Sequence, residues 1–590
     1  MNKLNLLLKK QVYPYDYAKK LTDYYIPSLP PIDKFFNTLT QEHISKEDYE
    51  HAENIYRIFN CKTFLDYTLV YLMTDVYLLC DCFELFRKNT MIDSGLDAAK
   101  FVTKHSLNFQ EYLLYSGEKI PLITDRKMLQ FIQKGIRGGF SVINTKLSLA
   151  NNEFCGELYD SSKPKSYMLY LDANNLYSKA LSYKLAFSDY EWLSQEEMNK
   201  IDFETLSPED DIGYIVEVDL SYPDKIHDET ADFPFCLEKM NIKEEMLSSY
   251  SQNLKNKLGV KHSVGQKLVG TLYDKKNYII HSRLLSFFLN NGMKLTKIHR
   301  GVKFYQKEWL KDYMDKNTKM RQKADSKITR DFYKLKNNSI YGKLLQSDKG
   351  KIRVKVVSNI QGFDKQIALP NFKSYIQINE NITLVVLEKK TKLTRPLPAA
   401  VCCLDLSKLV MYQFHKITRT YLPNSKILFS DTDSFLLYVE TENVYKDLKS
   451  FTQYLDTSNY HPDHELYSNS DKLKPGLFKD EFPINNLTNP ELPIIFVGLK
   501  PKMYMLFTNY NQHYVKSKGV GGNKAKTYKL SDFVNCLLKG ECQKDRIVSI
   551  RSRDAQIFTE QSIKITLNPF DDKRYFINAI FSIPYGYFGL

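Results

Sequence analysis

Hydrophobic positions along the chain change their spacing from segment to segment, and each spacing predicts a different element. Apolar residues recur at helical spacing in residues 47–60 and 65–87, which predicts two helices near the N-terminus. The unbroken apolar run 166–171 is typical of a buried strand, and two apolar runs around a polar tip predict a β-hairpin over residues 426–440. The long polar stretch 303–345 predicts one or two helices. The pattern therefore indicates a chain that mixes helices with strands.

The chain is too long to fold around one hydrophobic core. It has 590 residues, of which 43% are hydrophobic, and chains of this length divide into several domains. No run of 18 apolar residues occurs, and the apolar patch within residues 1–10 is too short for a signal peptide, so we expect no membrane partner. Nine scattered cysteines lack the spacing of zinc sites and predict reduced thiols in an intracellular protein of the nucleus or cytoplasm.

Positive charge is concentrated in one part of the chain. The formal net charge is +14, and residues 294–355 hold 19 lysines and arginines against six aspartates and glutamates. Aromatic residues such as Trp309, Phe332 and Tyr341 are interleaved with these charges. Cations suit phosphate backbones and aromatic rings stack on unpaired bases. A solvated helix face is the alternative on composition alone, but the motifs inside the stretch favour nucleic-acid binding.

Three aspartates stand at the ends of the predicted strands. Asp431 and Asp433 lie two residues apart at the hairpin tip, a spacing that puts both carboxylates on one side of an extended chain. Asp172 follows the apolar run directly. Like charges at this range repel, so they need a cation or a shared proton, and three carboxylates could hold two Mg²⁺ ions. The alternative is a solvated turn, because aspartate favours turns.

Six short motifs occur along the chain. They are Tyr71-x3-Asp75, Arg137-Gly138-Gly139, Asp172-Ala-Asn-Asn-Leu176-Tyr177, Lys334-x3-Asn338-Ser-x-Tyr341-Gly342, Asp431-Thr432-Asp433-Ser434 and Lys502-Met-Tyr504. In this order they resemble the motifs of family B DNA polymerases of the protein-primed type, and the resemblance covers essentially the whole chain. Stretches such as 570–574 and Tyr585-Gly586 look closest to the polymerases of Polinton/Maverick and adintovirus-like elements.

The resemblance implies a role for each motif. The expected catalytic carboxylates are Asp172, Asp431 and Asp433, with Asp172 and Asp433 bridging two Mg²⁺ ions that Mn²⁺ can replace. The expected contacts with the incoming deoxynucleoside triphosphate are Leu176, Tyr177, Arg321, Arg330, Lys334, Asn338, Tyr341 and Gly342. Tyr177 is the expected steric gate against a 2′-hydroxyl group. The expected contacts with the DNA primer-template are Arg137, Gly138, Gly139, Thr432, Ser434, Lys502 and Tyr504.

The resemblance also implies an α+β fold of the right-hand type. Palm, fingers and thumb would follow a truncated RNase H-like 3′-5′ exonuclease domain. The expected divisions are residual exonuclease 1–93, linker and first palm segment 94–183, protein-priming insertion 184–300, fingers 301–345, second insertion 346–395, palm 396–510 and thumb 511–590.

The expected exonuclease is incomplete. Tyr71 and Asp75 match the third exonuclease motif, but the family's earlier Asp-x-Glu strand and second aspartate motif are missing from the 74 residues before Asp75. The pair Asp48 and Glu50 lies in a predicted helix and is more typical of solvated charges. Proofreading needs several carboxylates around two metals. We therefore expect no proofreading, as in a fragment, an incomplete gene or a decayed copy.

These patterns predict a DNA-directed DNA polymerase that extends a primer 3′-hydroxyl in the replication of a virus or mobile element. A terminal protein that supplies the priming hydroxyl is the further partner that the resemblance suggests. Two alternatives stay open. An inactive remnant would bind nucleic acid without extending a primer. A reverse transcriptase is another palm polymerase, although its hairpin tip usually carries Asp-Asp rather than Asp-Thr-Asp.

Overall fold

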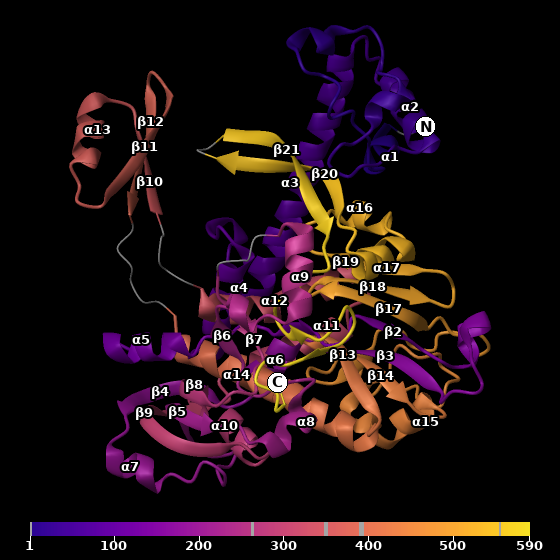
Figure 1. The fold of residues 1–590 in the computed structure, drawn as a ribbon. Coiled ribbons are helices and arrows are strands. Elements are labelled where there is room, and N and C mark those ends of the chain that lie inside the picture. The colour runs from indigo at the N-terminus through magenta and orange to yellow at the C-terminus, as the bar shows by residue number, and fades with distance from the viewer. Residues whose placement is uncertain (1–2, 261–264, 347–351, 389–394, 554–555, 590) are drawn as a thin grey trace.

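The N-terminal part of the protein is helical. The computed structural model describes residues 3–260, 265–346, 352–388, 395–553 and 556–589 (Figure 1). Residues 3–140, all of them described, contain no β-strand. The helices of this part are α1 Lys3–Leu8, η1 Leu21–Tyr25, η2 Ile32–Phe35, α2 Lys46–Ile58, α3 Phe64–Ser94, η3 Ala98–Lys100, α4 Lys104–Ser116 and α5 Arg126–Lys134.

Helix α3 joins the N-terminal part to the rest of the molecule, and with α2 it confirms the two expected helices. The Thr63 hydroxyl accepts a hydrogen bond from the Asp66 amide, while the Asp66 carboxylate accepts one from the Thr63 amide. The helix ends at Gly95, whose φ of 69° suits glycine. Phe64 and Tyr67 at its start are buried against α2.

A mixed sheet contains both the apolar run and the hairpin that the sequence predicts. Its strand order is β1-β13-β14-β3-β16-β15, and every pair is antiparallel except β15 with β16. The strands are β1 Ser141–Ile143, β3 Ser166–Ala173, β13 Ser425–Asp431, β14 Ser434–Glu440, β15 Leu455–Asp456 and β16 Phe478–Asp480. Both predicted elements are confirmed, and we call this sheet the palm sheet.

Helix α14, Leu397–Tyr421, packs against one face of the palm sheet. Its Phe414 ring stacks on Phe478 of β16, with ring centroids 3.4 Å apart. By length and composition α14 could cross a membrane, but 83% of its most apolar stretch is buried, as in a core helix. The other helices beside the sheet are η4 Glu153–Leu158, α6 Leu176–Leu181, α15 Val444–Leu448 and η7 Lys449–Tyr454.

A second sheet covers the opposite face of the palm sheet. Its order is β19-β18-β17-β2, with β2 Leu147–Leu149, β17 Pro493–Lys500, β18 Met503–Thr508 and β19 His513–Ser517. Side chains alternate between faces along a strand. Phe435 of β14 therefore joins the core around α14, whereas its neighbour Leu436 packs with Phe496 of the second sheet.

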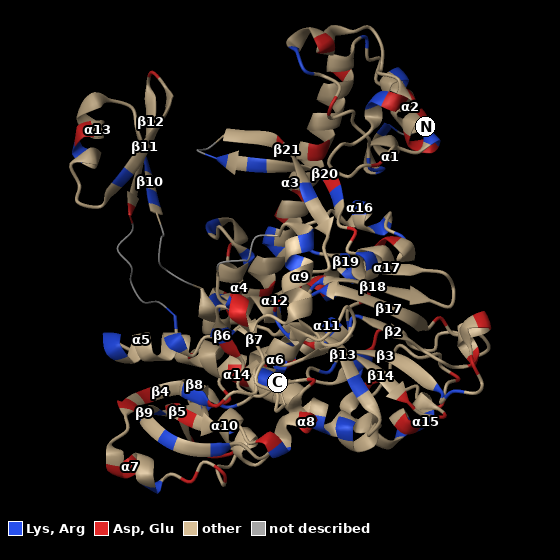
Figure 2. Ribbon diagram, in the orientation of Figure 1, with Lys and Arg blue, Asp and Glu red and all other residues tan. Residues whose placement is uncertain are grey.

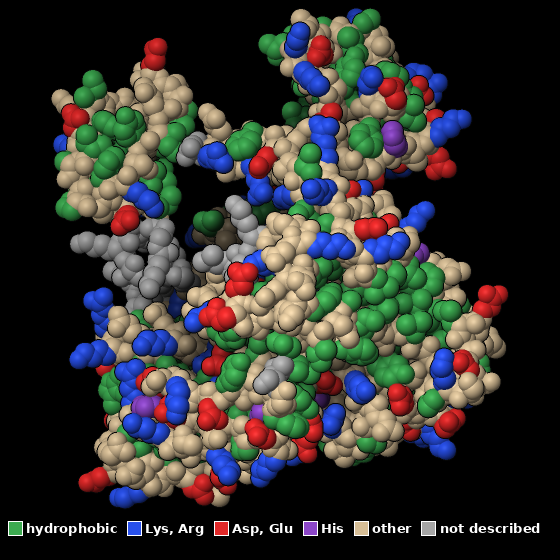
Figure 3. All heavy atoms as spheres, viewed as in Figure 1, with side chains coloured by type: hydrophobic (Ala, Val, Ile, Leu, Met, Phe, Trp, Pro, Cys, Tyr) green, Lys and Arg blue, Asp and Glu red, His purple; other side chains and the backbone are tan. Residues whose placement is uncertain are grey.

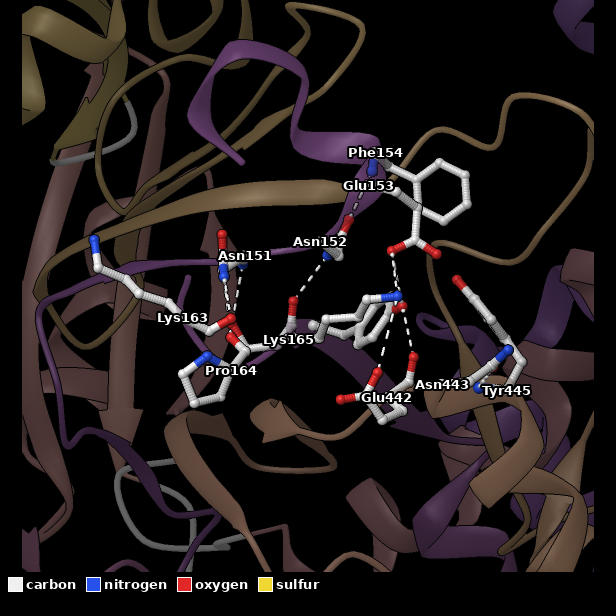
Figure 4. Close-up of polar contacts among 12 residues, drawn as sticks. Asn151, Asn152, Glu153, Phe154, Lys163, Pro164, Lys165, Glu442, Asn443 and Tyr445 are labelled. Carbon is white, nitrogen blue, oxygen red and sulfur yellow. Dashed lines mark hydrogen bonds and ion pairs between the residues drawn. The ribbon is translucent and has the colours of Figure 1, made fainter. Parts of the chain in front are cut away.

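Polar contacts fix the start of β3, at the end of the strand opposite Asp172 (Figure 4). The Asn151 side chain donates hydrogen bonds to the carbonyls of Lys163 and Pro164, at 3.3 and 3.0 Å. The Lys165 ammonium lies 3.5 Å from the Glu153 carboxylate. These contacts resist a slip of β3 by one residue, which would turn Asp172 to the other face of the sheet.

Residues 185–307 contain a third sheet, of order β4-β9-β5-β8. Its strands are β4 Leu185–Trp192, β5 Ile212–Ser221, β8 Lys275–His281 and β9 Lys294–Lys307. The elements around it are α7 Gln195–Lys200, η5 Asp224–Ile226, α8 His227–Thr230, β6 Glu238–Met240, η6 Glu244–Met246, α9 Ser249–Leu258, β7 Lys267–Val269 and α10 Ser282–Leu289.

Strand β9 corrects part of the helical prediction. Residues 303–307 were expected to be helical, but they belong to β9, which pairs with β4 on one side and β5 on the other. Pairing with residues far away in sequence overrides the polar local pattern. The expected boundary between insertion and fingers at residue 301 therefore falls inside a strand.

Helices α11, Lys311–Gln322, and α12, Lys327–Leu345, confirm the rest of that prediction. Lys336 of α12 is buried, and its ammonium lies 2.5 Å from the Asp93 carboxylate and 2.8 Å from that of Glu111. A buried charge with two partners is costly to separate from them. This group therefore fixes α12 to the end of α3 and to α4.

The remaining elements complete the outer parts of the molecule. A small unit with sheet order β10-β12-β11 stands apart from the main body in Figure 1. It consists of β10 Ile352–Val357, α13 Ile360–Ile367, β11 Phe372–Asn379 and β12 Ile382–Glu388. The expected thumb contains α16 Gly522–Lys526, α17 Leu530–Lys539 and the long hairpin of β20 Gln543–Arg553 with β21 Gln556–Leu567. The chain then returns to the body through β22 Tyr575–Phe576 and β23 Ser582–Ile583.

Candidate active site

The pairing of β3 with β14 brings two of the predicted catalytic aspartates together. Asp172, near the end of β3, lies opposite Ser434, the first residue of β14. The Ala173 amide donates a hydrogen bond to the Asp433 carbonyl at 2.7 Å, which holds Asp433 beside Asp172. Asp431 ends the neighbouring strand β13. The three carboxylates therefore meet at one end of the palm sheet.

The hairpin tip depends on the segment that precedes β1. Thr432 has a φ of 73°, which is uncommon for a residue other than glycine. Its amide donates a hydrogen bond to the Phe140 carbonyl at 2.7 Å, and the Asp433 amide donates one to the Asp431 carbonyl at 2.9 Å. A Cβ atom on Gly139 would lie only 2.4 Å from Thr432 Cγ2. Glycine at position 139 thus allows the tip to approach the chain beneath it.

Burial and mutual repulsion make negative charge costly at this site. Burial, together with the carboxylates of Asp433, Glu481 and Asp431, raises the pKa of Asp172 to about 8, although the Lys334 ammonium acts in the opposite direction. Burial and the Asp431 carboxylate also raise the pKa of Asp433. A cation between the carboxylates would relieve this repulsion.

This crowding of charge fits a divalent metal site that the substrate would complete. Across the described ranges, no three Asp, Glu, His or Cys side chains form a ready-made metal-binding group. Magnesium is usually held by one or two carboxylates together with waters and substrate phosphates. Asp172 and Asp433, adjacent and partly buried, match the protein's share of such a site.

Asp431 is paired with a lysine. The Lys502 ammonium lies 2.8 Å from Asp431 Oδ1, and the Lys502 side chain stays 45% exposed. Tyr504 is buried: its ring centroid lies 4.4 Å from that of Phe429, and its hydroxyl forms a 3.3 Å hydrogen bond with the Tyr170 hydroxyl. Lys502 is therefore open to a ligand, whereas the Tyr504 ring packs within the protein, and its contact with DNA stays a prediction.

Two aromatic residues from distant motifs meet beside the aspartates. The rings of Tyr177 and Tyr341 stack with centroids 4.2 Å apart and an angle of 3° between their planes. Tyr177 lies in α6, whose first turn follows Asn175 in the left-handed conformation, with φ of 44°. The Leu176 side chain is part of the hydrophobic core and only 3% exposed, so only the Leu176 backbone is left to contact a nucleotide.

The cationic side of α12 is turned toward the same aspartates. The Lys334 ammonium acts to lower the pKa of both Asp172 and Asp433, although burial raises both pKa values overall. The predicted residues that are exposed along α12 are Arg330, Lys334, Asn338 and Gly342. Arg321 of α11 is partly buried, and burial lowers the pKa of its guanidinium.

Two residues predicted to contact DNA have buried side chains. The Arg137 guanidinium is buried, donates a hydrogen bond to the Ile279 carbonyl at 2.6 Å and lies 3.8 Å from the Tyr278 ring centroid. Ser434 is only 2% exposed within β14. Both side chains are enclosed in this structure, and their contacts with DNA stay predictions. Gly138, by contrast, is exposed, and no atom of a more distant residue lies within 4 Å of the position that a Cβ atom would take there.

The sequence analysis missed two carboxylates that act on the site. Glu481 lies directly after β16 and raises the pKa of Asp172. Asp456 is buried and accepts hydrogen bonds from the Asn174 side chain at 2.6 Å and the Leu473 amide at 2.8 Å. Asp456 thus holds the loop between Asp172 and Tyr177. Glu481 forms an acidic pair with Asp480, which is a weak local signal, and Asp456 lies 282 residues from Asn174 and gives none.

A groove leads from Asp431 toward the expected thumb. Its volume is about 480 Å³, and its basic lining residues are Lys502, Lys516 and Lys518. Figure 2 shows further Lys and Arg residues on α16 and β20, and Figure 3 shows basic side chains at the surface of this region. Positive charge along a groove that ends at Asp431 suits a DNA backbone.

The exonuclease motif lies outside this site, on α3. The Tyr71 hydroxyl forms a 2.6 Å hydrogen bond with the Tyr15 hydroxyl, and Asp75 is exposed one turn later. Within the described part of the chain, no group of three metal-binding side chains includes Asp75. The structure therefore places these two residues on a helix without bringing partner carboxylates to them.

Comparison with known structures identifies the class of fold. The orthorhombic crystal form of phi29 DNA polymerase matches with a TM-score of 0.50 and 13% identity, over 92% of this chain and 77% of the phi29 chain. The phi29 polymerase complexed with primer-template DNA matches with a TM-score of 0.48 and 13% identity, over 92% and 77% of the two chains. The fold is that of a right-hand polymerase, which confirms the mixed helix and strand architecture expected from the sequence.

The family follows from the sequence itself. The family described as DNA polymerase type B, organellar and viral, matches residues 2–416, and the chain belongs to this family. The protein is a DNA-directed DNA polymerase, a nucleotidyltransferase that binds DNA and nucleotides in DNA replication. A comparison with curated proteins found no match.

We predict that Gly139→Ala destabilises the protein, whereas Gly138→Ala does not. The methyl group at position 139 would overlap the Thr432 side chain, and overpacking of this kind costs about 1–3 kcal/mol. The methyl group at position 138 meets open space, so its effect should stay within about 0.5 kcal/mol. Thermal unfolding of the two variants measures the difference. Equal melting temperatures would contradict the tight approach of the hairpin tip to residue 139.

Proposed function

We propose that the chain extends a primer 3′-hydroxyl by two-metal-ion nucleotidyl transfer, with Asp172 and Asp433 as the shared metal ligands. The junction of β3 with β14 carries this proposal, because it sets two partly buried carboxylates side by side. Two Mg²⁺ ions bound there would activate the 3′-hydroxyl and stabilise the leaving pyrophosphate. Asp431 adds negative charge to the site and is kept in place by Lys502.

Lys334 is the proposed partner of the triphosphate. Its ammonium acts on both Asp172 and Asp433, so it faces the space where phosphates would lie between α12 and the palm sheet. Negative charge grows on the leaving phosphates during transfer, and a fixed cation stabilises that change. Arg330 extends the same exposed helix surface one turn earlier.

The stacked rings of Tyr177 and Tyr341 are the proposed surface for the incoming nucleotide. Every base has a flat face that can stack on an aromatic ring. Tyr177 lies in the turn that follows Asp172, so a sugar bound at the metal site would lie against its ring. A 2′-hydroxyl would then have no room, which selects deoxynucleotides.

Priming by a protein is the proposed way in which synthesis begins. Support comes from the family of organellar and viral type B polymerases and from the two extra units, residues 185–307 and 352–388, inserted between the motifs of the active site. A terminal protein would present a Ser, Thr or Tyr hydroxyl in place of a primer 3′-hydroxyl. The same reasoning places the polymerase in a viral or mobile element, of which Polinton-like elements are the proposed type.

We also propose that the exonuclease is incomplete. An RNase H-like domain needs a β-sheet to position its carboxylates, and residues 3–140 hold helices alone. Asp75 is exposed on α3 without a surrounding metal-binding group in the described ranges. Our proposal is that the described part of the chain lacks the set of carboxylates that would remove a mispaired 3′ nucleotide.

Primer extension tests the polymerase site. We predict that the wild-type chain extends a DNA primer with Mg²⁺ and four deoxynucleotides, and that Asp433→Asn lowers the rate at least about 1,000-fold because a shared metal ligand is lost. The matched control is Asp463→Asn, since the Asp463 side chain is 80% exposed in a loop. Primer extension by Asp433→Asn at the wild-type rate would contradict the proposal. DNA binding without extension by any of the chains would favour an inactive nucleic-acid-binding remnant.

Degradation of a 5′-labelled single strand tests the exonuclease proposal. We expect no metal-dependent shortening from the 3′ end, either by the wild-type chain or by Asp75→Ala, in preparations that extend a primer. Rapid shortening by the wild-type chain that disappears in Asp75→Ala would show that a working exonuclease is present.

A further inference from the structure

Residues 568–589, which we call the C-terminal segment, leave the thumb hairpin and return to the body of the molecule. Figure 1 shows the C-terminus between α6 and α8, away from the tips of β20 and β21. Isolated bridges pair Phe581 with Thr145, which lies between β1 and β2, and Tyr585 with Thr271. The segment thus connects the palm with the unit of residues 185–307, although the sequence grouped it with the thumb.

A buried lysine of the palm holds this segment in place. Lys146 is 1% exposed, and its ammonium donates a hydrogen bond to the Pro569 carbonyl at 2.6 Å and lies 3.9 Å from the Phe576 ring centroid. The Lys146 amide donates a second hydrogen bond, to the Ile580 carbonyl at 2.9 Å. The C-terminal segment is therefore an integral part of the palm.

Charged residues of the segment reach the neighbouring unit and the catalytic hairpin. The Asp572 carboxylate accepts hydrogen bonds from the Lys267 ammonium at 2.7 and 2.5 Å. Arg574 is buried beside Asp232, and the Asp232 carboxylate accepts a hydrogen bond from the amide of Ile427 in β13 at 3.1 Å. Strand β13, which ends at Asp431, is thus supported through this cluster of charges.

Lys573 lies between Asp572 and Arg574 in the sequence, and its side chain reaches strand β1. Its ammonium donates a hydrogen bond to the Ser141 carbonyl at 2.8 Å. Ser141 is the β1 residue paired with Asp431 in β13. Burial lowers the pKa of Lys573, and the carboxylates of Asp571, Asp572 and Asp431 act in the opposite direction.

We propose that Lys573 is a positioning residue for nucleotidyl transfer, which holds β1 and the Asp431 carboxylate in register at the base of the catalytic hairpin. The inference rests on the proposed role of Asp431. The ammonium fixes β1 through the Ser141 carbonyl, and the next carbonyl back, that of Phe140, receives the Thr432 amide of the hairpin tip.

Lys502 and Lys573 have different tasks in this arrangement. Lys502 is bound directly to Asp431 and is 45% exposed, so it can exchange the carboxylate for a primer phosphate. The Lys573 side chain is more enclosed than that of Lys502, and burial lowers the pKa of the Lys573 ammonium. A lysine bound to a backbone carbonyl in such surroundings can stay in place throughout the reaction cycle. Loss of Lys573 should therefore impair the chemical step more than the binding of substrates.

Substitution of Lys573 in the full chain tests this inference. Lys573→Met removes both charge and donor, Lys573→Gln keeps a donor without charge, and Lys573→Arg keeps both. We expect Lys573→Met to lower kcat for primer extension about 10- to 100-fold, because small displacements of catalytic groups cost this much. The KM for deoxynucleotides and the Kd for primer-template should change less than about twofold. Lys573→Arg should recover most of kcat, with Lys573→Gln between the two.

A matched control separates positioning from general damage. Lys446→Met removes an exposed lysine of α15, and it should keep wild-type kcat and melting temperature. If Lys573→Met fails to fold, the comparison of Lys573→Gln with Lys573→Arg decides the question. Wild-type kcat in the folded Met or Gln variant, or equal losses of kcat in Gln and Arg, would overturn the inference. A wild-type chain that does not extend a primer would instead defeat the proposed function, and this inference with it.

Discussion

The backbone pairing of β3 with β14 is the constraint on which the active site depends. It places Asp172 opposite Ser434 and joins Ala173 to Asp433 through a single hydrogen bond. A shift of one residue in this register would turn Asp172 away from its partner. Much of the surrounding structure protects the register, from the polar contacts at the start of β3 to the segment that supports the hairpin tip.

The cost of this pairing is a concentration of negative charge in partly buried surroundings. Cations from separate parts of the chain act on this site: Lys334 from α12, Lys502 from the turn after β17 and, through the Ser141 carbonyl of β1, Lys573 from the C-terminal segment. None of the three is next to an aspartate of the site in sequence. The fold therefore offsets part of the negative charge before any metal or nucleotide binds, and the raised pKa of Asp172 shows that repulsion remains for a cation to relieve.

Local pattern accounts for the parts of the fold that the sequence predicted well. The helices α2 and α3, the strand β3 and the β13–β14 hairpin each have a periodicity that their own residues determine. Strand β9 could not be recognised in this way, since its pairing with β4 and β5 depends on distant residues, such as Leu185, which pairs with Lys307. Short motifs located the aspartates, Tyr177, Tyr341 and Lys334, all of which the structure brings together at one end of the palm sheet.

Motifs alone could not tell which side chains are free to meet a ligand. Arg137, Ser434 and Tyr504 match their motifs, yet each side chain is buried. The Arg137 guanidinium donates a hydrogen bond to the Ile279 carbonyl and lies over the Tyr278 ring. Burial of this kind depends on contacts far apart in sequence. The same holds for Asp456 and for Lys573, whose partners lie 282 and 432 residues away. Residue type indicates the chemistry, but only tertiary packing decides which groups perform it.

Metal binding by the assembled site tests the central claim most directly. Mn²⁺ binding can be followed by electron paramagnetic resonance in complexes with a dideoxy-terminated primer-template and the next deoxynucleotide, for the wild-type chain and Asp172→Asn. The account predicts two bound Mn²⁺ ions per wild-type complex and the loss of at least one in Asp172→Asn, since Asp172 is a shared ligand. Identical Mn²⁺ binding by both chains would contradict the assignment of Asp172 and Asp433 as the metal-binding pair.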